Sequence, residues 1–156
     1  MEYLEVESKI LNMFEKTLFC TLATANRVGV VSASQVCLIN SGLTIFVQTD
    51  KTFEKVNNIK ENPNFAINCG AYYFKGKAEI LGHPSIYPDF IQKVKEKHLS
   101  TYNSYTNLPN EVLIKIELYE AKIWGGDNSK DIHNQETILV VDLINKKTNT
   151  IICDKM

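Results

Sequence analysis

The sequence predicts a mainly β fold with α-helical additions, arranged as a barrel. Six or more short apolar runs are typical of strands, and turn signals separate them at short intervals, as in barrels. Other segments carry apolar residues at helical spacing, one at the N-terminus and two between strands. With 156 residues the chain is long enough to bury a substantial core, and we expect one domain over residues 1–156.

The first half of the chain predicts three consecutive strands between two helices. The expected elements are a helix over Glu2–Lys16, strands over Leu18–Thr24, Val30–Ile39 and Leu43–Gln48, and a helix over Thr52–Glu61. Asn40-Ser41-Gly42 is a tight-turn signal, and Pro63 is expected to end the second helix. Three strands joined by short turns indicate an antiparallel sheet.

The second half predicts further strands and a third helix. The expected elements are strands over Asn64–Cys69 and Tyr72–Leu81, a helix over Tyr87–Lys97, an irregular connection over Ser100–Asn110, a strand over Val112–Trp124, and a closing hairpin of Thr137–Leu143 and Thr150–Cys153.

The composition is that of an ordinary soluble globular protein, with 44% apolar and 22% charged residues. A net charge of -1 argues against nucleic-acid and membrane partners. The sequence contains no run of eighteen apolar residues, so we expect no transmembrane helix. The acidic, periodic start of the chain is unlike a signal peptide, so we expect a cytoplasmic protein.

The cysteines and histidines do not form a local metal-binding pattern. Cys20, Cys37, Cys69 and Cys153 are far apart, and His83, His98 and His133 are scattered. We therefore expect no metal site and no redox pair, and we expect the cysteines in apolar runs to be buried packing residues.

Two lysines mark the expected start of the helix that follows the third strand. Lys51 precedes Thr52, and Lys55 occupies the position where a capping box would have Glu or Gln. A helix N-terminus is already electropositive, so extra positive charge there favours a bound anion such as phosphate. The alternative is that both lysines are solvated, with Asp50 and Glu54 beside them. The residues alone leave both interpretations open.

The order of short motifs resembles a known family. Phe46-Val47-Gln48-Thr49-Asp50-Lys51-Thr52-Phe53-Glu54-Lys55 is followed by Ile59-Lys60-Glu61-Asn62-Pro63 and, one strand later, by Lys75-Gly76-Lys77-Ala78-Glu79. Over Leu18–Trp124 the chain is similar to the pyridoxamine 5'-phosphate oxidase-like flavin-binding split barrels, above all the small bacterial members. The resemblance implies a six-stranded antiparallel split barrel and a homodimer, with flavin mononucleotide (FMN) in a groove between the subunits.

The resemblance also assigns roles to particular residues. Thr49, Lys51, Thr52 and Lys55 match the segment that holds the FMN phosphate. Ser34, Gln35 and Val36 match the strand that runs along the isoalloxazine edge, where backbone groups can bond the ring. Trp124 matches a late family tryptophan, so it covers a ligand or a dimer interface, or else is a structural aromatic residue.

Several positions depart from the oxidases of the family. Ser34 and Glu54 stand where those enzymes have phosphate-binding arginines, and Lys130 stands where they have an arginine that grips the substrate. His133 is displaced by one position from the family histidine. These departures argue against a true pyridoxamine 5'-phosphate oxidase.

The resemblance implies an FMN-dependent oxidoreductase, with a reduced nicotinamide, NAD(P)H, as electron donor and a small acceptor such as a nitro-aromatic compound or a quinone. No catalytic residue is assigned, because the cofactor carries the electron chemistry in such enzymes. The first alternative is a non-catalytic flavin- or haem-binding module for storage or sensing, and haem would need a histidine over the groove. The second alternative is an empty groove in a protein that acts through its dimer contacts.

Overall fold

The protein is described by a computed structural model that covers residues 2–125 and 137–153. In these residues the strands form a single antiparallel sheet with the order β2-β1-β5-β6-β7-β4-β3, and a hairpin of β8 and β9 extends from β7. The strands are β1 (Phe19–Ala25), β2 (Val31–Cys37), β3 (Ile39–Ser41), β4 (Thr44–Asp50), β5 (Asn64–Cys69), β6 (Tyr72–Ile80), β7 (Glu111–Trp124), β8 (Thr137–Asp142) and β9 (Lys147–Ile152).

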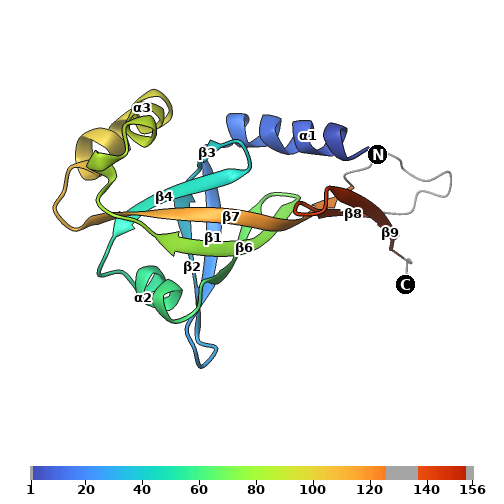
Figure 1. Ribbon diagram of the computed structural model, residues 1–156, viewed down its shortest axis with the longest axis horizontal. Coiled ribbons are helices and arrows are strands. Elements are labelled where there is room, and N and C mark those ends of the chain that lie inside the picture. The colour runs from blue at the N-terminus through green and yellow to red at the C-terminus, as the bar shows by residue number, and fades with distance from the viewer. Residues whose placement is uncertain (1, 126–136, 154–156) are drawn as a thin grey trace.

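Helices cover the curled sheet and lie mostly near one end of it (Figure 1). The helical elements are α1 (Tyr3–Lys16), α2 (Glu54–Glu61), η1 (Pro84–Ile86), α3 (Pro88–Lys97), α4 (Leu99–Thr101) and η2 (Tyr102–Thr106). The long strand β7 runs along the molecule, with α2 and α3 near its N-terminal end and the β8–β9 hairpin near its C-terminal end (Figure 1).

The sheet is a split barrel, as expected. Strands β2 and β4 approach each other without forming a ladder, so the curled sheet stays open between them. The six strands β1, β2, β4, β5, β6 and β7 make the barrel, and three more extend it. The sequence did not predict the short strand β3 as separate from β2; Leu38 is buried between the two strands. The last residues of β7, over 120–124, continue past the end of β4 and pair with β8 on that side, while residues 120–123 still pair with β6 on the other.

The main core fills the inside of the barrel. Helix α1 contributes Val6, Ile10 and Phe14, all fully buried, and the Phe14 ring lies 5.3 Å from the Phe74 ring of β6. A second, smaller core forms where Phe90 and Val94 of α3 pack on Ile39 and Leu113. The main core therefore holds α1 and α2 against the sheet, and the second core holds α3.

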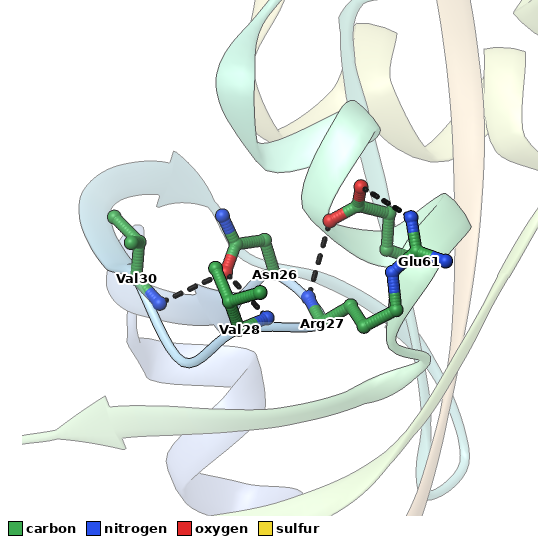
Figure 2. Close-up of polar contacts among 5 residues, drawn as sticks. All are labelled: Asn26, Arg27, Val28, Val30 and Glu61. Carbon is green, nitrogen blue, oxygen red and sulfur yellow. Dashed lines mark hydrogen bonds and ion pairs between the residues drawn. The ribbon is translucent and has the colours of Figure 1, made fainter.

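The C-terminal end of helix α2 is bonded to the turn of the β1–β2 hairpin. Figure 2 shows that the Asn26 side chain closes the hairpin turn by accepting hydrogen bonds from the backbone N–H groups of Val28 and Val30. Next to it, the backbone N–H of Arg27 donates to the Glu61 carboxylate at 3.1 Å, and the guanidinium lies 3.7 Å from the same group. The hairpin and the helix are therefore joined near the open side of the barrel.

Two local predictions were wrong. Helix α2 begins at Glu54 rather than Thr52, because the Asp50 carboxylate accepts hydrogen bonds from both the N–H and the hydroxyl of Thr52 and holds the turn away from the helix. Residues 99–106 are helical rather than irregular: α4 runs directly into a π-helical turn, η2, which is anchored by the Thr106 hydroxyl donating to Gln48 Oε1 at 2.7 Å. No helix in the described part of the chain is long and apolar enough to cross a membrane.

Candidate functional site

The end of β4 and the start of α2 bring a buried hydroxyl and a half-buried lysine together. Thr49 is 6% exposed, and the Lys55 ammonium donates to its hydroxyl at 3.4 Å. The ammonium also lies 5.3 Å from the centre of the Phe53 ring. Burial lowers the pKa of Lys55, and the nearby Glu111 partly opposes this effect. None of the ion pairs among residues 2–125 and 137–153 involves Lys55.

The helix start itself is open to a ligand. Within the described structure, the N-cap residue Phe53 makes no side-chain capping bond. The N–H of Val56 donates to Phe53 O at 3.0 Å, which leaves the N–H groups of Glu54 and Lys55 without a backbone acceptor among the described residues, and the helix dipole adds positive potential there. An uncapped helix start beside an unpaired, partly desolvated ammonium has the donor set that a phosphate needs.

The neighbouring turn is held in place by its own contacts. The backbone N–H of Lys51 donates to Asn110 O at 2.8 Å, and the Lys51 side chain is exposed. The Thr52 hydroxyl donates to Asp50 at 2.7 Å, which lowers the pKa of the Asp50 carboxyl. In this structure the N–H and the hydroxyl of Thr52 therefore both donate to Asp50, and neither is available to a bound phosphate.

A buried polar triad, not predicted from the sequence, connects α2 to strands β1 and β2. The Asn58 amide donates to Thr24 Oγ1 at 3.1 Å and to Ser32 Oγ at 3.4 Å, and the two hydroxyls lie 3.2 Å apart. Asn58 is three residues after Lys55 and lies on the same helix face. The sequence signal for this triad was the position of Asn58, a polar residue next to Ile59 on the buried side of the helix.

A buried carboxylate is the second feature that the sequence did not reveal. Glu111, 8% exposed, begins β7 directly opposite Asp50. Burial raises the pKa of its carboxyl, Asp50 raises it further, and His83 and Lys55 lower it. A charged residue just before a strongly apolar strand was its only local signal.

Two of the three predicted residues of β2 face inward and the third faces outward. Ser34 is half-buried on the inward face, two residues after Ser32, whereas Val36 is buried in the core and Gln35 is exposed on the outer face. Among the described strands β2 pairs only with β1, so alternate backbone groups along its other edge face the open side of the barrel. This free edge fits the predicted backbone role, which needs no particular side chain.

Trp124 lies far from the predicted phosphate-binding residues within one chain. It ends β7 and is 42% exposed, while Glu111 at the other end of that strand faces Asp50. Thirteen residues of strand correspond to roughly 40 Å. One chain therefore does not bring Trp124 to Lys55. The predicted residues Lys130 and His133 lie outside the described residues.

Neither of the two described histidines presents a free and accessible ring nitrogen. The Nε2 atom of His83 lies 2.8 Å from Leu108 O and its Nδ1 atom lies 2.7 Å from Ser85 Oγ, so both ring nitrogens are engaged. His98 is 6% exposed, and burial lowers its pKa.

The chain matches a family model described as pyridoxamine 5'-phosphate oxidase over residues 6–125. A search of curated proteins finds no match. Among solved structures, general stress protein 26 of Bacillus anthracis aligns with a TM-score of 0.62 and 20% identity, over 75% of this chain and 92% of that one.

Two further solved structures share the fold. The haem storage protein HutZ of Vibrio cholerae aligns with a TM-score of 0.62 and 15% identity, over 76% of this chain and 91% of that one. A pyridoxamine 5'-phosphate oxidase-related, FMN-binding protein of Nostoc punctiforme aligns with a TM-score of 0.58 and 11% identity, over 98% and 93%.

Proposed function

Because the chain belongs to the pyridoxamine 5'-phosphate oxidase family, we propose that it binds FMN and works as a flavin-dependent oxidoreductase on a small molecule. The observation that carries the proposal is the half-buried Lys55 ammonium, in contact with the Thr49 hydroxyl at the uncapped start of α2. Desolvating an ammonium is unfavourable unless a counter-charge compensates for it, and the phosphate of FMN would supply that charge.

The residues present fit the phosphate end of FMN. Lys55 and Thr49 would hold the phosphate from the end of β4 and the start of α2, and Lys51 would add charge from the solvent side. The Asn58 triad fixes α2 against β1 and β2, so the helix start keeps a constant position relative to the free edge of β2. That edge would bond the ring system through backbone groups.

The chain's own part in the reaction is then binding, orientation and control of access. When bound, FMN would supply the electron and hydride chemistry, with NAD(P)H as donor. This division of labour is consistent with a site that contains a cation, hydroxyls and amides but no arrangement of nucleophile and base among the described residues.

We further propose a homodimer, with the outer face of the sheet at its interface. Ala33, Ala23 and Ala66 lie side by side across β2, β1 and β5, which makes this face flat. An apolar hollow of about 260 Å³ adjoins them and is lined in part by Tyr73, which is 47% exposed. Association through this face would also explain how Trp124, remote in its own chain, could serve the site of a partner.

Haem is the second candidate ligand, because HutZ shares the fold. The engaged ring of His83 and the buried ring of His98 argue against a haem ligand among the described residues. We therefore favour the flavin.

The visible spectrum of the purified protein, followed by titration with FMN and then with haemin, tests the proposal. We expect oxidised-flavin bands, or saturable FMN binding if the flavin is lost in purification, and consumption of NAD(P)H with a quinone or nitro-aromatic acceptor. A haem spectrum with no FMN binding would replace the proposal by the storage function. Bound FMN that none of these donors and acceptors turns over would leave a flavin-binding module.

A further inference from the structure

Cys20 and Cys69 face each other on neighbouring strands, although 48 residues separate them in the sequence. Thr21 of β1 is opposite Asn68 of β5, so the next pair along the antiparallel ladder is Cys20 and Cys69. Directly opposite residues in such a ladder have Cα atoms about 4.5–5.5 Å apart, within the range that a disulfide needs. Both side chains point into the main core, with exposures of 4% and 8%.

The two sulfur atoms interact with each other and with one lysine. Hydrogen bonding with the Cys20 thiol lowers the pKa of Cys69, burial opposes this effect, and the nearby Lys97 lowers the pKa further. Because Cys20 is the donor and is buried, its own pKa is raised. Lys97 is fixed beside the pair, since its ammonium donates to Phe14 O at 2.8 Å. The Lys97 charge therefore favours a thiolate at this pair, and the thiolate is the form of cysteine that reacts with peroxides.

Access favours Cys69 as the sulfur that attacks the peroxide. It is the last residue of β5 and is followed by the exposed turn of Gly70 and Ala71, so a molecule as small as hydrogen peroxide has a short route to the sulfur. The other two cysteines lack such a partner in the described residues: Cys37 lies 3.6 Å from the Thr101 hydroxyl, and Cys153 follows β9.

We propose that Cys20 and Cys69 form a reversible dithiol site, which hydrogen peroxide converts into a disulfide between β1 and β5. The Cys69 thiolate attacks one peroxide oxygen, the O–O bond breaks, and hydroxide leaves, so that Cys69 becomes a sulfenic acid. The Cys20 sulfur then attacks the Cys69 sulfur, the S–O bond breaks, and water leaves with the proton of the Cys20 thiol. Two thiols lose two electrons, and one peroxide becomes two water molecules.

The bond would close the loop over residues 20–69, which contains β2, β3, β4 and the whole of α2. This loop carries Thr49 and Lys55, so the oxidised form would have its candidate phosphate site on a cross-linked segment. The dithiol itself is independent of the flavin proposal, because none of its groups belongs to that site.

Peptide mapping of the native protein tests the proposal without any substitution. The reduced protein, freed of reductant, is treated with hydrogen peroxide. It is then unfolded in a denaturant that contains an alkylating agent, which blocks the remaining thiols, and is digested. We expect a Cys20–Cys69 linked peptide, two hydrogen atoms lighter than its parts, that dithiothreitol separates again. Cys37 and Cys153 are expected to be alkylated. Recovery of Cys20 and Cys69 as alkylated thiols, or as separately over-oxidised residues, would overturn the proposal.

Two variants check the order of the steps. Cys20→Ala is expected to leave Cys69 as a sulfenic acid that a 1,3-diketone such as dimedone labels, whereas Cys69→Ala is expected to give no label at Cys20. Cys37→Ala is the matched control and is expected to form the linked peptide as the natural protein does. Labelling of Cys20 but not Cys69 would reverse the assigned roles and contradict the proposal.

Discussion

Lys55 is the residue on which the FMN proposal depends most directly. Replacing Lys55 with Ala removes a charged donor to the phosphate, and we expect FMN affinity to fall by about 1–3 kcal/mol, which is roughly 5–150-fold. Lys60→Ala is the matched control, because Lys60 is an exposed lysine in the last turn of the same helix. Titration followed by flavin fluorescence measures both. Equal losses in the two variants would mean that only net charge matters and that the phosphate binds elsewhere.

Glu111 gives a prediction about pH. Burial raises the pKa of its carboxyl above the ordinary value of 4.5, so the folded protein holds a proton that the unfolded chain releases. Between 4.5 and the raised value the unfolded state binds fewer protons, and stability falls as pH rises. We expect Glu111→Gln to be more stable than the natural protein above this window and the gain to vanish below about pH 4.5.

Urea denaturation across pH 4 to 8 measures this difference, with Glu117→Gln as the control. Glu117 lies on the same strand but is exposed and pairs with Lys115 at 3.0 Å. A stability gain in Glu111→Gln that does not change with pH would show that titration of this carboxyl is not its cause.

At the scale of elements, the placement of α2 depends on the Asn58 triad. Asn58→Ala leaves the buried hydroxyls of Thr24 and Ser32 without the amide donor, and we expect a loss of stability of about 1–3 kcal/mol. FMN binding should weaken as well, since the helix start moves more freely. Asn57→Ala is the control, because its side chain is exposed one position earlier. Similar denaturation midpoints for the two variants would show that the triad does not hold the helix.

Local pattern was enough to predict most elements and failed where a side chain competes with the backbone. The strand over Asn64–Cys69 was predicted with its observed bounds, because buried and exposed residues alternate along it. Helix α2 was predicted two residues too long, since the Asp50 side chain captures Thr52. The helical turns of η2 were missed because a segment rich in Ser, Thr, Asn and Tyr has little apolar periodicity, and Gln48 of a distant strand anchors it.

In the candidate site, too, only contacts between residues close in sequence could be predicted. Thr49 and Lys55 are close in sequence, so strand end and helix start bring them together by local geometry alone. Asn58 with Thr24, Glu111 with Asp50, and Cys20 with Cys69 are pairs set by strand register or helix docking. A single sequence contains no signal for such register, and the same reason hid the distance between Trp124 and the residues predicted to hold the phosphate.

At the scale of the whole molecule, the proposed dimer is testable by one charge. Ala66→Arg places a bulky cation on the flat outer face, and we expect it to shift the protein from dimer to monomer at micromolar concentration. Light scattering measures the mass. Ile144→Arg is the control: Ile144 is 67% exposed in the β8–β9 turn and is not on that face. A monomer mass for the natural protein would remove the dimer from the proposal.

Membership of the family does not carry its parent activity, and we expect the FMN-loaded protein to oxidise pyridoxamine 5'-phosphate poorly. Ser34 is half-buried on the inward face of β2, and the sequence resemblance matches it to an arginine of the oxidases of the family. Serine supplies a hydrogen bond without charge, and Lys130, outside the described residues, cannot reproduce the planar two-pronged grip of arginine on a phosphate.

Binding energy on a remote substrate phosphate normally holds the reacting carbon against the flavin, so its loss should lower turnover as well as affinity. An assay with pyridoxamine 5'-phosphate and oxygen decides the question, with a genuine oxidase of the family run in parallel. Formation of pyridoxal 5'-phosphate at a comparable rate would show that neither arginine is needed and would assign the parent reaction to this chain. The expected trace of product, together with turnover of NAD(P)H and another acceptor, would place the specificity of the site in the residues that replaced those arginines.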